Sequence, residues 1–231
     1  MKFQRPSFLY PLFSEITLIP GIGPKTFKLL ESKIGKKVID LLFHLPHTVI
    51  NRLNNLDLKH CPTNSIITKK ILITKHISNF YNSRRPYKLI GDCENFEIEI
   101  VFFNYKGQYI EKNFPVNSVV IVSGKINRFN EIVKFTNPDY IYEVSQIDKI
   151  PKFEPIYPLT AGVNNKLLSK SIRHAIKLIP PDLPEWIPNK IVKENNWPSF
   201  SEALKSIHIP NTMIEVDNKS SYLQRLSSVS Y

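Results

Sequence analysis

The feature that most constrains the fold is a series of strand-like runs between residues 66 and 144. They are rich in β-branched and aromatic residues, alternate apolar with polar positions, and are not interrupted by a long helical pattern. The runs are IITKKILITKHISNFY (66–81), KLIGDCENFEIEIVFFN (88–104), SVVIVSGKINRF (118–129) and EIVKFTNPDYIYEV (131–144), with turn-like NSRRP, YKGQ and RFNE segments at 82–86, 105–108 and 128–131. Several short strands in succession predict a small closed or partly open barrel, and we expect five strands of the OB type.

Short helices are predicted before the barrel. Residues 14–18 and 26–33 are expected to be helical, and the glycine-containing turn IPGIGPK at 19–25 joins them. A further amphipathic stretch at 38–45 is closed by Pro46. Together these patterns predict a helix-hairpin-helix-like segment.

The composition changes after the barrel. Residues 151–163 are punctuated by prolines and are expected to be an extended connector, and residues 211–231 are polar and serine-rich and are expected to fray. Helical pieces are predicted around 165–179, 185–195 and 199–206. The sequence thus predicts an α+β protein with a helical segment at 1–55, an OB-fold barrel at 56–150, and a connector with helical pieces at 151–231.

The balance of charge favours a polyanionic partner. The 231 residues carry a formal net charge of +11, with an isoelectric point near 9.5. The excess of lysine and arginine is spread along the chain instead of forming a polybasic arm, so a generally basic surface is an equal alternative.

Cysteine usage and hydropathy indicate a cytoplasmic protein with no membrane partner. Cys61 and Cys93 form no CxxC pair, and reduced thiols are the simplest interpretation. Prolines and an early glutamate interrupt the apolar residues of the N-terminus, and no apolar run approaches the length of a membrane span.

Residues 101–114, VFFNYKGQYIEKNF, combine aromatic side chains and lysines around one glycine. If the strand alternation holds, Phe102 points inward and Phe103 outward, whereas Tyr105 and Tyr109 fall in or after a turn. Aromatic faces interleaved with cations suit stacking on unpaired bases and holding phosphate. Strand aromatics also commonly fill cores, so the sequence leaves a core role open.

The GIGPKT run at 21–26 does not form a nucleotide-binding loop. A Walker A loop needs glycine directly before its lysine, and Pro24 stands there; the chain also has no Asp-Glu dipeptide for a DExx box. In a helix-hairpin-helix-like turn, Gly21 and Gly23 would let the backbone approach a phosphate, and Lys25 would add a charge beside it. A plain turn between packed helices is the alternative.

Other patterns indicate binding more than chemistry. Arg84 and Arg85, in the NSRRP turn, suit phosphate contacts at a barrel rim, although an exposed loop pair is the commoner explanation. The histidines lack metal-ligand spacing, and no constellation for nucleophilic or acid–base catalysis is visible. We therefore expect no enzyme activity, metal or cofactor on this chain.

Taken in order, these segments resemble the N-terminal, non-motor part of the RecG family of ATP-dependent branched-DNA helicases. Each run is weak by itself, and their order over about residues 15–210 makes the resemblance specific. The matching runs are IPGIGPKTFKLL, DLLFHLPHTVINR, VFFNYKGQYIEKNF, VSGKI, NPDYI, PIYPLTAGV, LPEWIP and FSEALKSIHIP.

The resemblance implies a wedge domain of OB fold that contacts the branch point of a replication fork or Holliday junction. In that family, aromatics near the FFN run stack on bases where the arms separate. Carried over, these are Phe103 and Tyr109, with Tyr105 as a substitute because the spacing is two residues longer here.

Beyond residue 210 the chain departs from the family. It keeps Leu223, Gln224, Arg225 and Leu226, then reads SSVSY, where the family continues into its ATPase motor. We therefore expect a truncated or split RecG-like protein that binds branched DNA and depends on a separate motor chain, if one exists. A non-functional remnant of a decayed gene and a protein-interaction module remain as alternatives.

Overall fold

The structure, a computed structural model, divides into two compact units. The helical unit comprises residues 1–50 and 153–231, and the barrel unit comprises residues 51–152. Described residues are 6–53, 56–77, 86–103, 107–129, 132–159, 161–181, 183–217 and 219–227.

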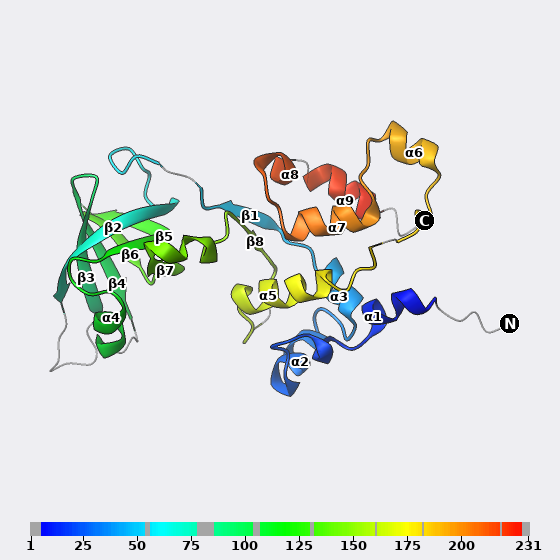
Figure 1. Cartoon of the computed structure of the whole chain (residues 1–231), viewed down its shortest axis with the longest axis horizontal. Coiled ribbons are helices and arrows are strands. Elements are labelled where there is room, and N and C mark those ends of the chain that lie inside the picture. The colour runs from blue at the N-terminus through cyan, green and yellow to red at the C-terminus, as the bar shows by residue number, and fades with distance from the viewer. Residues whose placement is uncertain are drawn as a thin grey trace. The chain divides into compact units, whose positions relative to one another are not determined.

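The barrel unit is a closed five-stranded barrel. Its strands are β2 (Ile66–Ile77), β3 (Tyr87–Cys93), β4 (Phe96–Phe102), β5 (Val119–Phe129) and β6 (Ile132–Thr136). They are hydrogen-bonded in the order β2-β3-β4-β6-β5, and β5 pairs back onto β2 (Figure 1). The β4–β6 pair is parallel, and the other pairs are antiparallel. The predicted α+β class and OB-like barrel are confirmed.

Two further elements complete this unit. Strand β7 (Tyr140–Glu143) pairs antiparallel with β5, and η3 (Val144–Lys149) follows it. The turn before β7 passes close to β5, because a Cβ on Gly124 would lie 3.1 Å from the Pro138 Cα. Glycine at this position therefore permits the close approach of the two segments.

Inward-facing side chains follow the two-residue period of the strands. On β4, Ile98, Ile100 and Phe102 are buried, as the alternation predicts. Each fully buried aliphatic side chain of this kind contributes roughly 1.5–3 kcal/mol. The other strands add to the same core Ile67, Ile71, Ile73, Leu89, Val120, Val122, Ile126, Val133 and Phe135.

A short helix, α4 (Gly107–Asn113), lies at one end of the barrel (Figure 1). The sequence predicted only a turn at 105–108, so the helix is an addition to that expectation. Ile110 and Phe114, four residues apart, are buried in the barrel core. Burial of this pair explains why so short a segment is helical, since isolated helices of this length are unstable in water.

An ion pair lies at the other end of the barrel. Lys69 Nζ lies 2.6 Å from Glu94 Oε1, and the lysine side chain is only 3% exposed. Glu94 belongs to the turn between β3 and β4, at the end of those strands where Cys93 faces Phe96. The two ends of the barrel thus differ in chemistry.

The helical unit has one core made from both of its segments. The sequence predicted 1–55 and 151–231 as separate regions, whereas their apolar side chains form one cluster. Its elements are η1 (Ser7–Leu9), α1 (Tyr10–Phe13), η2 (Ile16–Leu18), α2 (Pro24–Glu31), α3 (Val38–Phe43), β1 (Thr48–Asn51), β8 (Phe153–Ile156), α5 (Asn165–Ile176), α6 (Asn189–Glu194), α7 (Phe200–His208), α8 (Met213–Asp217) and α9 (Lys219–Ser227), with β1 paired to β8.

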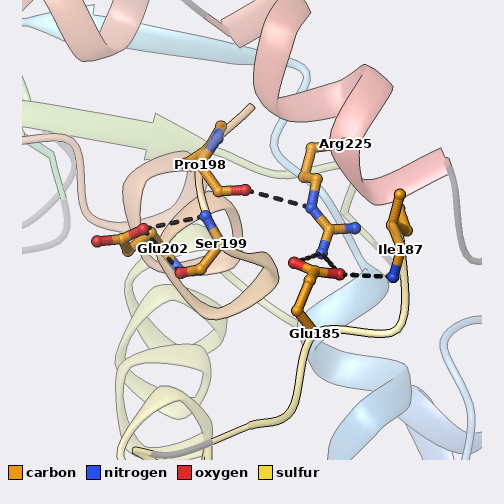
Figure 2. Close-up of polar contacts among 6 residues, drawn as sticks. All are labelled: Glu185, Ile187, Pro198, Ser199, Glu202 and Arg225. Carbon is orange, nitrogen blue, oxygen red and sulfur yellow. Dashed lines mark hydrogen bonds and ion pairs between the residues drawn. The ribbon is translucent and has the colours of Figure 1, made fainter. Parts of the chain in front are cut away.

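The expectation that residues 211–231 fray is wrong for most of the part that the structure describes. Figure 2 shows Arg225 of α9 pointing at Glu185, with Nη2 2.9 and 2.7 Å from the two carboxylate oxygens. Arg225 Nε donates to the Pro198 carbonyl, and its guanidinium lies over the Trp186 ring. The side chain is fully buried, and Leu226 beside it joins the core. These contacts hold α9 in place.

Candidate nucleic-acid interface

Phe103 follows the last residue of β4 and turns away from the core. It is 46% exposed, whereas the neighbouring Phe102 is 2% exposed. Its N–H donates to Asn137 Oδ1 at 2.9 Å, and the Asn137 N–H donates to the Val101 carbonyl at 2.8 Å. The turn before β7 therefore fixes the backbone at the end of β4, and the aromatic ring is left accessible.

Tyr109 is a second exposed aromatic residue near Phe103 in the chain. It lies on α4, is 56% exposed, and precedes the fully buried Ile110. The two aromatics are six positions apart in the chain, which limits their Cα–Cα distance to about 20 Å. The exposure of Phe103 follows from strand alternation, because its neighbour Phe102 faces the core. The exposure of Tyr109 follows from helix periodicity, because its neighbour Ile110 faces the core.

A hydrogen-bonded network ties α4 to the strands at this end. His76 of β2 lies 2.6 Å from the Tyr87 hydroxyl through Nδ1, and 2.9 Å from the Phe114 carbonyl through Nε2. The Tyr87 hydroxyl donates to Glu111 Oε1 of α4 at 3.0 Å. Burial, reinforced by the Glu111 carboxylate, raises the pKa of Tyr87 well above its ordinary value. Since Tyr87 pairs with Phe102 in the sheet, the network lies beside the Phe103 turn.

The outward face of the barrel near β3 and β4 carries cations that are already paired. Glu99 lies 2.8 Å from both Lys88 and Lys134. Burial raises the pKa of Glu99, but hydrogen bonds and charges from the two lysines outweigh it, and the net shift is downward. Phosphate would have to compete with this carboxylate for both lysines, so this face is less suited to binding DNA than the barrel end.

The other candidate phosphate contact lies at the N-terminus of α2, in the helical unit. Gly21 has φ of +95°, a conformation that favours glycine, and Gly23 is the N-cap residue with no side-chain cap. A Cβ on Gly23 would meet nothing within 4 Å, and Lys25 is exposed. The first N–H groups of a helix lack partners within it, so the backbone here is open to an anion.

Comparison with known proteins identifies the family. The model of the RecG wedge domain matches residues 15–179. The chain belongs to the RecG wedge domain family. The resemblance seen in the sequence is thereby confirmed.

Curated relatives are much longer than this chain. The "ATP-dependent DNA helicase RecG" of Staphylococcus epidermidis strain ATCC 12228 is 26% identical over 197 residues, which is 83% of this chain and 27% of the relative. The protein of the same name from Bacillus subtilis strain 168 is 27% identical over 208 residues, 86% of this chain and 28% of the relative. The wedge chain thus spans less than a third of the length of these helicases.

A solved structure supports the fold. "Structure of RecG bound to three-way DNA junction" superposes with a TM-score of 0.73 and 19% identity, and the match covers 98% of this chain and 30% of that one. The chain therefore has the fold of that part of the solved protein.

The structure describes some of the site residues expected from sequence and omits others. Phe103 and Tyr109 are exposed in the barrel unit, whereas Gly21, Gly23 and Lys25 belong to the helical unit, and each group is described in its own unit. Arg84, Arg85 and Tyr105 lie outside the described residues.

Sequence reasoning missed the residues that position the segments carrying Phe103 and Tyr109. Asn137 could have been suspected, because Asn-Pro marks a turn. His76, Tyr87 and Glu111 gave no signal, since their contacts join β2, β3 and a helix that was expected to be a turn. Within the described parts of the chain, no helix has the length and apolarity needed to cross a bilayer.

Proposed function

We propose that this chain is a RecG-like wedge module that binds branched DNA, such as a fork or Holliday junction, at the α4 end of its barrel. The observation that carries the proposal is the pair of exposed aromatics, Phe103 and Tyr109, at this end of a wedge-family barrel. Stacking contributes about 1–3 kcal/mol per unpaired base, and unpaired bases are available where duplex arms separate. Tyr105 is a further candidate for the same role.

Phosphate contacts would supply the rest of the affinity. The open α2 N-terminus, with Gly21, Gly23 and Lys25, suits a phosphate without reading base sequence. Arg84 and Arg85 would add charge from the β2–β3 connection. Contacts of this kind release counterions, so binding is expected to weaken steeply as salt rises.

The proposal assigns binding, not ATP hydrolysis, to these residues. No Walker A sequence occurs among the 231 residues, and the role proposed for Phe103 and Tyr109 is to hold DNA. A helicase motor chain is the partner that this proposal implies. The motor would drive the DNA against the wedge, and the wedge would keep the strands apart.

A gel-shift comparison of forked, duplex and single-stranded DNA at two salt concentrations tests the proposal. Preferential fork binding that weakens with salt is expected, and equal binding to all three DNAs, or none, would overturn it. A protein-interaction module would give the latter result.

The double variant Phe103→Ala/Tyr109→Ala localises the interface. Because both rings are exposed, fork affinity should fall by about thirtyfold or more, the effect of two lost stacking contacts, while the melting temperature stays nearly unchanged. Phe8→Ala is the matched control, since Phe8 is 44% exposed and lies in the helical unit. Loss of folding in the double variant would instead favour a core role for these aromatics.

A further inference from the structure

The network that holds α4 lacks one hydrogen when His76 is neutral. The Phe114 carbonyl can only accept, so the His76 Nε2 must carry a hydrogen and donate to it. In a neutral imidazole, Nδ1 is then an acceptor facing the Tyr87 hydroxyl at 2.6 Å. The same hydroxyl faces the Glu111 carboxylate at 3.0 Å, and it has one hydrogen for two acceptors.

Protonation of His76 removes this conflict. With a hydrogen on each ring nitrogen, Nδ1 donates to the Tyr87 oxygen and Nε2 to the Phe114 carbonyl. The Tyr87 hydrogen is then available for Glu111, and every group in the chain of contacts has a suitable partner. The network also places a cation and a carboxylate on either side of one hydroxyl, which strengthens both hydrogen bonds.

Among the described hydrogen bonds of His76, both partners are uncharged groups, the Tyr87 hydroxyl and the Phe114 carbonyl. The titratable or charged groups on its own strand and on the elements packed against that strand are Lys69, Lys70 and Lys75 on β2, Tyr87, Lys88, Asp92 and Cys93 on β3, Lys125 and Arg128 on β5, and Tyr109, Glu111 and Lys112 on α4. Lys88 is paired with Glu99, and the raised pKa of Tyr87 keeps that residue a hydrogen donor. Glu111 is thus the carboxylate that the protonated ring would complement.

We propose that His76, Tyr87 and Glu111 form a pH-sensitive lock that positions α4, and with it Tyr109, for branched DNA. The proposal rests on the function proposed above and adds its regulation. With His76 protonated, α4 is tied to β2 and β3 and the wedge aromatics are held ready for bases. Loss of the proton leaves two acceptors competing for one hydrogen, and α4 loosens.

The Glu111→Gln variant removes the need for the proton while keeping the shape. Its amide can donate to the Tyr87 oxygen, so the Tyr87 hydrogen is free for the neutral Nδ1 of His76. Its carbonyl can equally accept from Tyr87 when the ring is protonated. In this variant every hydrogen-bonding group of the network has a partner whether His76 is neutral or protonated. Helix α4 should therefore stay tied to β2 and β3 throughout pH 5 to 8.5.

The first test uses no DNA. NMR signals of the His76 ring and the Tyr109 ring are followed in the full chain from pH 5 to 8.5, the range in which imidazoles change charge. The two are expected to titrate with the same midpoint, and Glu111→Gln should abolish the Tyr109 response. A Tyr109 ring that ignores the His76 titration would overturn the lock, whether or not the chain binds DNA.

The second test measures fork affinity by fluorescence anisotropy at pH 6 and 8.5 and constant ionic strength. The fork affinity of the wild type should be about fivefold weaker at pH 8.5 than at pH 6, which is the equivalent of one buried hydrogen bond. The fork affinity of Glu111→Gln should change less than about twofold between the same two pH values. His60→Gln is the control for general histidine charge, because the His60 side chain is 75% exposed. If the fork affinities of the wild type and Glu111→Gln depend equally on pH, the lock is overturned. If the chain does not bind forks but the His76 and Tyr109 signals titrate together, the result counts against the DNA-binding proposal alone.

Discussion

Asn137 holds the end of β4 in place: its Oδ1 accepts a hydrogen bond of 2.9 Å from the Phe103 N–H. Asn137 has φ of +44°, a conformation that asparagine tolerates better than most residues. The turn before β7 thereby determines the direction in which Phe103 leaves the sheet. This contact links the sequence run NPDYI to the FFN run, with 34 positions between Phe103 and Asn137.

Replacing Asn137 with alanine should loosen the Phe103 turn without disrupting the barrel. The lost hydrogen bond and the less tolerant side chain should together cost about 1–2 kcal/mol, measured by chemical denaturation. Fork affinity should fall, because Phe103 is no longer held outward. Asn137→Asp keeps the acceptor and should retain most of the stability; an equal loss in both variants would show that the hydrogen bond is unimportant.

Alanine at Gly21 should lower stability, whereas alanine at Gly23 should weaken DNA binding and leave stability unchanged. Gly21→Ala places a side chain at φ of +95° and should cost about 1 kcal/mol, seen as a lower melting temperature. Gly23→Ala puts a methyl group into open space, so stability should hold. If a phosphate approaches the α2 N-terminus, that methyl group should weaken DNA binding severalfold, and unchanged affinity would exclude this contact.

The helical unit should lose stability as pH falls because of His208. Burial lowers the pKa of His208 to about 4, a hydrogen bond to the Leu42 carbonyl opposes the shift, and nearby His44 adds to it. Between pH 6.5 and 4 the unfolded chain binds a proton that the folded chain excludes. Stability therefore declines across this window, by about 3 kcal/mol in total.

Thermal unfolding at pH 7, 5.5 and 4.5 measures this effect. Carboxylates also titrate in this range, so the His208→Gln variant provides the comparison. Its stability should depend less on pH than that of the wild type, although it is lower at pH 7 because the variant weakens the contact with Tyr157. Parallel pH profiles would show that His208 is not the titrating group.

Removing Arg225 should destabilise the helical unit strongly. Arg225→Ala leaves the partly exposed Glu185 without its bidentate partner and opens a space beside Trp186, at a cost of about 3 kcal/mol. The matched control is Lys190→Ala, which breaks an exposed pair 3.9 Å from Glu194 and should cost less than about 0.5 kcal/mol. Calorimetry of both variants distinguishes the two; similar melting temperatures would contradict a structural role for Arg225.

The barrel could be predicted from sequence because its signal is local. Alternation of Ile98, Ile100 and Phe102 specifies both the strand and its inward face, and the exposure of Phe103 follows from the same period. Helix α4 could not be predicted in this way, because its seven residues are helical only through the burial of Ile110 and Phe114 in a core made by other strands.

Relationships between distant residues escaped prediction. In the sequence, Arg225 belongs to what reads as a polar tail. The burial of its guanidinium is explained by partners far away in the chain, such as Glu185, forty residues earlier. The contacts of His76 with Tyr87 and of Asn137 with Phe103 are likewise products of strand pairing. Residue types and their spacing along the chain do not show which distant residues the fold brings together.

The helical unit is interrupted in sequence by the barrel, and this has a consequence for synthesis on the ribosome. Leu12, Ile16 and Val38 share a core with side chains of α5 and α7, which are translated more than a hundred residues later. At ordinary elongation rates the first helices wait on the order of ten seconds for these partners. The barrel has all of its strands by residue 143 and can close meanwhile, so the part of the protein made second is the first that can fold.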